Sequence, residues 1–257
     1  MSVLAAMLLA VTLGACAASA PDAAPRAPVT VDPVRPRLRG HPPPPATTST
    51  PSTPTGSPVE PRPAPEPPAF ASSISPITPA LAARLTPTSW REGCPVPLAD
   101  LRYVTVSHWT FEGTVTAGEL VVHADVADDV RGVFSSLFAV RFPIRSMRLV
   151  DDFGGDDDAS MAADNSSAFN CRAVTGGTAW SEHAYGRALD LNPVENPYVL
   201  DDLVLPPPGR AFLDRPDAPG VIHADDAVVR ALAAAGWRWG GYWDRPVDYQ
   251  HFSVSGR

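Results

Sequence analysis

A long proline-rich stretch is the feature that most limits what this chain can fold into. Between Pro21 and Pro79 prolines alternate with Thr, Ser and Ala, as in HPPPPATTSTPSTPTGSPVEPRPAPEPP, and large apolar side chains are nearly absent. Such a composition cannot bury enough surface to offset the entropy lost on ordering, and its prolines favour extended conformations. We therefore expect residues 17–87 to form a semi-rigid spacer, or a disordered tail without function, and residues 88–257 to form one folded domain.

The first residues have the composition of an export signal. Residues 1–16, MSVLAAMLLAVTLGAC, form an apolar run too short to span a bilayer comfortably, and small residues precede Cys16. This pattern resembles a bacterial lipobox, in which Cys16 would be lipidated after transport; the alternative is an ordinary cleaved signal peptide. Both interpretations predict export, and the first predicts a membrane lipoprotein that faces the cell wall.

The net charge limits which molecules the protein can bind, and the cysteines suggest a disulfide. The net charge of −8 argues against nucleic acid or an anionic membrane surface, since binding to either is driven by a basic face. We expect a monomer that meets the membrane only through its lipid anchor. In an oxidising compartment, Cys94 and Cys171 are expected to form a disulfide, and two free buried thiols are the alternative.

The folded part shows strand and helix patterns that do not alternate regularly. Phe134 and its apolar neighbours recur at helical spacing between residues 128 and 142, and Asp225 precedes a second helical pattern that ends at Gly236. Alternating or β-branched segments predict strands at residues 103–111, 119–126, 144–150, 187–191, 237–243 and 248–254. Residues 151–167 are acidic and predict a solvated loop, with a cation site as the weaker alternative. The pattern predicts an α+β domain with a mainly antiparallel sheet and flanking helices.

Two of the six histidines have a carboxylate at a meaningful distance. His183 precedes Asp190 by seven residues, and His251 follows Asp248 by three. A catalytic zinc site uses three protein ligands and keeps one position open, and a further carboxylate is needed to move protons. The four residues therefore predict one zinc ion with a general base beside it, although each histidine alone is more often structural, and Asp248 could be a turn residue.

These residues resemble the motif of the zinc D-Ala-D-Ala carboxypeptidases and related cell-wall peptidases that share the Hedgehog/DD-peptidase fold. The motif is Ser-x-His-x-x-Gly-x-Ala-x-Asp followed later by an acidic residue, two residues and a histidine. It is matched by Ser181, His183, Gly186, Ala188, Asp190, Asp248 and His251. The resemblance covers roughly residues 140–255. It implies His183, Asp190 and His251 as zinc ligands, and Asp248, where many members have Glu, as the general base.

The resemblance also implies supporting residues around the metal. An arginine upstream of the motif would stabilise the oxyanion, and in this chain it maps best onto Arg172, whose alternative role is an ordinary surface residue. We expect Ser181, Tyr185 and Gly186 to support the ligands or contact substrate. Trp237, Trp239 and Trp243 would line a substrate cleft or pack in the core. The cation for a substrate's terminal carboxylate is left open among Arg187, Arg210, Arg215 and Arg245.

The sequence thus predicts an exported zinc peptidase that hydrolyses peptidoglycan stem peptides, most simply as a D-alanyl-D-alanine carboxypeptidase. Cleavage inside a stem or cross-link is left open. The alternative from another class is a cell-wall-binding or scaffolding lipoprotein that retains the fold without turnover, and Asp248 in place of Glu is the feature that favours it.

Overall fold

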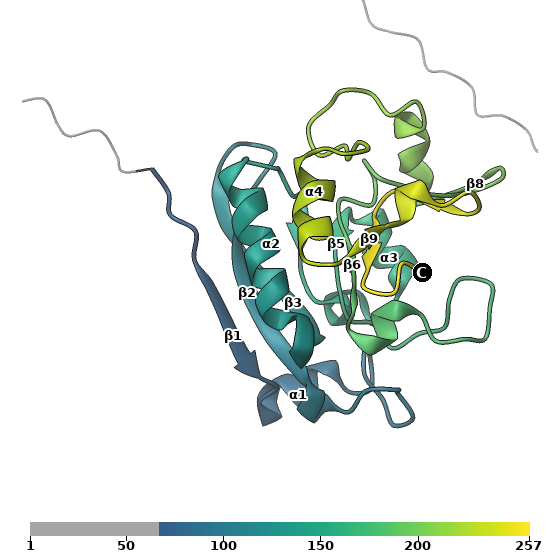
Figure 1. The fold of residues 1–257 in the computed structure, drawn as a ribbon. Helices are drawn as coiled ribbons and strands as arrows, with labels where there is room; N and C mark the ends of the chain where they lie inside the picture. The colour runs from purple at the N-terminus through teal and green to yellow at the C-terminus, as the bar shows by residue number, and fades with distance from the viewer. Residues whose placement is uncertain (1–66) are drawn as a thin grey trace, which may run out of the picture. The chain divides into compact units, whose positions relative to one another are not determined.

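The computed structural model describes residues 67–257 of the chain (Figure 1). The predicted export signal with Cys16 and most of the predicted spacer lie outside the described residues. Within residues 67–257, no helix combines the length and the apolar character that crossing a membrane requires.

A three-stranded antiparallel sheet opens the described chain. Its order is β1 (Ser72–Pro76), β2 (Leu101–Trp109) and β3 (Val115–His123), with β2 in the middle. The two strands predicted at 103–111 and 119–126 are therefore confirmed, with shifted ends. The shift arises because the connecting turn is short and closes with a hydrogen bond from Thr110 N to Thr114 O, so β3 begins early and pairs along all of β2.

The start of the folded chain lies before the predicted boundary at residue 88. Both β1 and helix α1 (Pro79–Leu85) belong to residues that the composition assigned to the spacer. In α1, Pro79 occupies the first helical position and the Thr78 hydroxyl accepts from Leu81 N, while Leu85 is buried. Proline is favoured at a helix start because no backbone donor is needed there. The boundary expected at residue 88 is therefore wrong.

Two helices cover the first sheet and its neighbourhood. Helix α2 (Ala127–Ala139) runs along the sheet and α4 (Ala227–Ala234) lies next to it (Figure 1). Both were predicted, and α2 buries the expected apolar face. The second helix is capped one residue later than expected, by Asp226, whose carboxylate accepts from Val229 N at 2.9 Å. Asp carboxylates are preferred there because they satisfy unpaired backbone donors.

Short strands form the part of the domain that follows α2. One sheet has the order β6 (Ala188–Asp190), β11 (His251–Ser253), β9 (Arg238–Trp239), and another has the order β10 (Val247–Asp248), β7 (Tyr198–Leu200), β8 (Leu203–Leu205). Both are antiparallel, and only β4 (Ser146–Met147) and β5 (Asn165–Ser166) pair in parallel among the described strands. The predicted α+β class with mainly antiparallel pairing is confirmed, but as several small sheets.

The acidic segment 151–167 is not the solvated loop that its composition predicts. It contains helix α3 (Asp157–Ala162), whose N-cap Asp156 accepts from Ala159 N at 3.1 Å. Carboxylates in a first helical turn are stabilised by the helix dipole, so the acidic run starts a helix. The remaining helical turns are 3₁₀ segments, at Leu98–Asp100, Ala124–Val126, Val150–Phe153, Glu182–Tyr185, Pro207–Phe212 and Gly240–Tyr242.

Two apolar clusters hold the domain together. The larger joins α2 and α4 to β2, β3, β6, β9 and β11, and the smaller packs α1 against the opposite face of β2 and β3. The smaller cluster contains the disulfide between Cys94 and Cys171, which confirms the predicted pairing. Because β6 and β11 belong to the larger cluster, the residues at their ends are fixed by the main core.

Candidate metal centre

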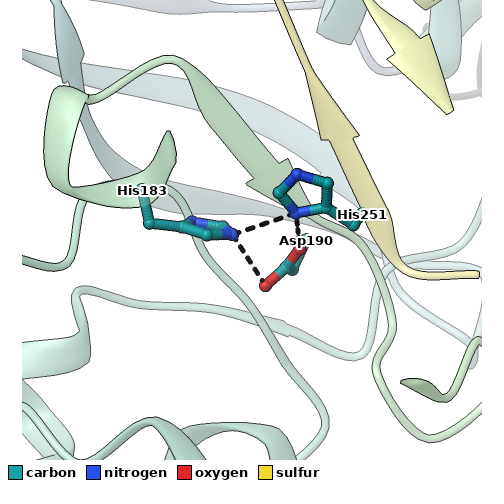
Figure 2. A group of neighbouring side chains, drawn as sticks. All are labelled: His183, Asp190 and His251. Atoms are coloured by element: carbon teal, nitrogen blue, oxygen red, sulfur yellow. Dashed lines mark hydrogen bonds and ion pairs between the residues drawn. The ribbon is translucent and has the colours of Figure 1, made fainter. Parts of the chain in front are cut away.

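Three side chains predicted as metal ligands meet at one point (Figure 2). Asp190 ends β6 and His251 begins β11, and the antiparallel register places these two residues opposite each other. His183 comes from the 3₁₀ turn Glu182–Tyr185, just before β6. Two paired strands and the turn leading into one of them therefore bring together residues that are 68 positions apart in sequence.

The three side chains are close enough to bind one ion. His183 Nε2 lies 3.1 Å from Asp190 Oδ2, and His251 Nδ1 lies 3.1 Å from Asp190 Oδ1. The two facing ring nitrogens are 3.2 Å apart. The residues are 2 %, 5 % and 6 % exposed in the order His183, Asp190, His251, so water screens them little.

The hydrogen bonds on the far sides of the rings fix the tautomers. His183 Nδ1 faces the Ala168 carbonyl, and His251 Nε2 lies 3.0 Å from the main-chain oxygen of Arg257. Each of these main-chain oxygens only accepts, so each of the two ring nitrogens carries the proton and donates. Neutral His183 and His251 therefore present unprotonated Nε2 and Nδ1 to the shared point. Such outer hydrogen bonds are the usual means of orienting a metal-binding imidazole.

The charge distribution of the His183, Asp190 and His251 cluster favours a positive ion at its centre. Burial alone would raise the pKa of Asp190, but His183 and His251 hold it well below its ordinary value. Burial works against a charge on His251, yet the nearby carboxylates of Asp190 and Asp248 favour positive charge at Nδ1 and keep the pKa of His251 above its usual range. Two nitrogen lone pairs and a carboxylate directed at one buried point repel each other unless positive charge lies between them. Two imidazoles and one carboxylate are a donor set that suits zinc.

The turn that carries His183 depends on two of the predicted supporting residues. Gly186 has φ = +67°, and a Cβ at this position would lie 2.6 Å from His123 N, so only glycine fits. The Ser181 hydroxyl accepts from His183 N at 3.3 Å and caps the turn. Tyr185, in contrast, packs against the smaller apolar cluster and does not line the cleft described next.

A cleft of about 340 Å³ opens over the three candidate ligands. Asp248 in β10 lines it, and its Oδ1 atom is buried without a hydrogen-bond partner. Burial, reinforced by the charge of Asp190, raises the pKa of Asp248 to about 7, although His251 opposes the shift. A carboxyl group that holds and releases a proton near neutral pH is suited to general acid–base catalysis.

Arg172 also lines the cleft, on a segment that the disulfide holds. Its guanidinium forms an ion pair with Asp157 at 2.8 Å, and its charge partly opposes the rise in the pKa of Asp248 that burial causes. Asn170 donates to the other Asp157 oxygen at 3.4 Å, and the disulfide at Cys171 fixes the adjacent backbone. The predicted oxyanion-stabilising residue is therefore placed in the cleft and held from two sides.

Comparison with known proteins agrees with this geometry. Residues 175–254 match the sequence model of a family described as D-alanyl-D-alanine carboxypeptidase. The predicted family resemblance is confirmed. This match indicates a peptidase. The matched segment contains all three candidate ligands together with Asp248, whereas Arg172 lies just before it. No curated protein and no solved structure matches the chain significantly.

None of the four arginines that the sequence offered for a terminal carboxylate lines the cleft. Arg187 pairs with Asp125 and Arg245 with Asp201 on the surface. The other two bind backbone or amide oxygens, Arg210 at Asp202 and Arg215 at Glu195, Asn196 and Ile222. The cleft instead carries Arg257, which sequence reasoning did not single out.

The tryptophans divide between core and cleft. Trp237 and Trp239 are buried in the larger apolar cluster, whereas Trp243 lines the cleft with its ring 5.4 Å from the His251 ring. Sequence reasoning missed Trp180, which also lines the cleft and is 38 % exposed. It also missed Asp157, although a carboxylate just upstream of a candidate catalytic arginine was a usable signal.

Proposed function

We propose that this protein is a zinc peptidase that hydrolyses peptidoglycan stem peptides, acting as a D-alanyl-D-alanine carboxypeptidase. The observation that carries the proposal is the convergence of His183 Nε2, Asp190 and His251 Nδ1 on one buried point, with both histidines in metal-binding tautomers. The family match over this segment supports the substrate class. We also propose that the domain has the Hedgehog/DD-peptidase fold, which the antiparallel β6–β11 pairing and the family match support.

The residues around the ligands divide the work of amide hydrolysis. When bound, zinc supplies a Lewis acid that polarises a carbonyl group and lowers the pKa of a water molecule. Asp248 Oδ1, buried and unpartnered, takes the proton from the attacking water and gives it to the leaving amine. Arg172 places positive charge in the cleft, where the carbonyl oxygen becomes negative. His183, Asp190 and His251 stay fixed through their outer hydrogen bonds.

The cellular setting completes the proposal. Residues 1–16 would direct export, Cys16 would carry the lipid, and the proline-rich segment would hold the peptidase away from the membrane. The negative net charge and the presence of a disulfide are compatible with an exported domain. Peptidoglycan peptides, which lie outside the membrane, would be in reach of a monomer anchored in this way.

The test uses the purified chain loaded with zinc and muropeptides of defined stem structure. Mass spectrometry of the products, with Asp248→Ala as the matched control, distinguishes the reactions. Loss of one alanine mass, absent in the control, is the expected result. A cleaved stem or cross-link would indicate an endopeptidase. If zinc binds one per chain while every substrate remains intact, the peptidase proposal fails, and binding to intact cell walls becomes the better explanation of the fold.

A further inference from the structure

The cleft contains two cationic side chains among the described residues, Arg172 and Arg257. Arg172 already forms an ion pair with Asp157, so part of its charge is compensated. For the Arg257 guanidinium, the described part of the structure shows no ion pair or hydrogen bond. Arg257 is also an exposed residue, so its charged group is accessible to a molecule that enters the cleft.

The backbone of Arg257 is tied directly to the metal centre. Its main-chain oxygen accepts from His251 Nε2 at 3.0 Å and from the Ser253 hydroxyl at 2.8 Å. The same Ser253 oxygen accepts from Gly256 N at 3.2 Å and from Arg257 N at 3.1 Å. Ser253 is fully buried in β11, so the loop 253–257 starts from a rigid strand. The Arg257 side chain therefore begins at a point fixed relative to the ligand His251.

The other charged groups that line the cleft are mostly acidic, which leaves Arg257 as the side chain suited to bind a negatively charged substrate group. Glu182 and Asp248 line the cleft in addition to the ligand Asp190 and the paired Asp157. Glu182, Asp248 and Asp157 would repel a negatively charged substrate group away from the zinc ion, so such a group is best received there by a guanidinium that has no carboxylate partner. The planar guanidinium of arginine binds a carboxylate through two parallel hydrogen bonds. Arg257 is the described cleft residue that combines free positive charge with this geometry.

We propose that Arg257 binds the free terminal carboxylate of the substrate and thereby restricts the enzyme to cleavage at the end of a peptide. The proposal rests on the proposed peptidase function, because it concerns the substrate of that same site. It distinguishes a carboxypeptidase from an endopeptidase, whose substrates present no carboxylate next to the cleaved bond.

The test measures binding, independently of turnover, in the zinc-loaded Asp248→Asn protein. The ligands are N-acetyl-D-alanyl-D-alanine and its C-terminal amide, and calorimetry gives both dissociation constants. The acid is expected to bind about 10- to 100-fold more tightly than the amide, as charged hydrogen bonds of ordinary strength require. Adding Arg257→Ala should reduce this ratio to near one by weakening the acid alone, and Arg257→Lys should restore part of it.

Two controls separate the side chain from the backbone. Arg257→Ala keeps the main-chain oxygen that accepts from His251, so the zinc content should remain one per chain. Arg131→Ala, on the exposed face of α2, removes an arginine far in sequence from the cleft-lining residues and should leave the ratio unchanged.

The outcomes for Arg257 and for the peptidase are distinguishable. An acid-to-amide ratio near one in the parent protein, binding of neither ligand, or a ratio that Arg257→Ala leaves unchanged would each overturn the role of Arg257. If the wild-type chain hydrolyses the amide as fast as the acid, the peptidase function stands and the carboxylate role does not. If the ratio depends on Arg257 but the wild type hydrolyses no peptide, Arg257 binds carboxylates and the peptidase function fails.

Discussion

Replacing Asp248 with Asn tests the proposed chemistry most directly. The change keeps the size of the side chain and removes its ability to accept a proton from water. Asp248 is not among the three converging ligands, so zinc binding should persist. A positioned general base contributes about 10²- to 10⁴-fold to a rate, and we expect kcat to fall by that factor.

The pH profile gives a second, independent quantity. The pKa of Asp248 is raised to about 7 by burial, so at pH 6 only about a tenth of the groups would be ionised. The rate should therefore fall about tenfold for each pH unit below the inflection. A bound dication favours the ionised form, which moves the inflection below 7. The assay is kcat/KM for D-alanine release between pH 4 and 9, with zinc content checked at each end.

Asp244→Asn is the matched control, because Asp244 is exposed in the preceding turn and undergoes the same chemical change. It should leave both the rate and the profile unaltered. If Asp248→Asn retains more than about a tenth of the wild-type kcat with zinc bound, Asp248 is not the general base. The same conclusion follows if the acidic limb survives unchanged in that variant, since another group would then move the proton.

Three further predictions concern the framework of the site. Ser253→Ala removes the hydroxyl that holds the main-chain oxygen of Arg257 against His251, and zinc affinity measured by chelator competition should fall about tenfold; an unchanged affinity would exclude this support. Burial and a hydrogen bond to a neighbouring carboxyl raise the pKa of Glu195 to about 8, so the folded protein keeps a proton that the unfolded chain has released. Stability in urea should therefore fall by roughly 1 kcal/mol per unit between pH 5 and 8, and Glu195→Gln, but not exposed Glu92→Gln, should flatten this slope. Gly186→Ala forces a side chain into left-handed backbone against His123 N, and thermal unfolding should show a loss of about 1–3 kcal/mol; an unchanged melting temperature would contradict the requirement for glycine.

Much of the candidate site could be predicted from local sequence. The spacing from Ser181 to Asp190 encodes a capped turn, a left-handed glycine and the start of a strand, all of which are short-range features. The helices α2 and α4 were predictable for the same reason, because apolar periodicity and caps act within a few residues of each other. The disulfide followed from having two cysteines in an expected oxidising compartment.

Two predictions made from composition were wrong, because tertiary contacts fold segments that look like spacer or loop. The segment 67–87 has the composition of a spacer, yet Phe70 and Ile74 pack against the larger apolar cluster, and Leu81 and Leu85 join α1 to the smaller one. The acidic segment looks solvated, yet it forms α3 and presents Asp157 to Arg172. A few specific contacts hold both segments in place, and the average composition of a segment does not reveal them.

The sequence by itself predicted the three residues of the candidate metal site from their motif, and it predicted the turn that carries His183 and the helices of the core because these depend on neighbouring residues. Only the tertiary structure decided which cations reach the cleft. Four plausible arginines are engaged elsewhere, while Arg257 arrives there because Ser253 and His251 bind its backbone. The charge of a long side chain does not determine its position. Its position is determined by the hydrogen bonds and ion pairs that the folded chain offers to it.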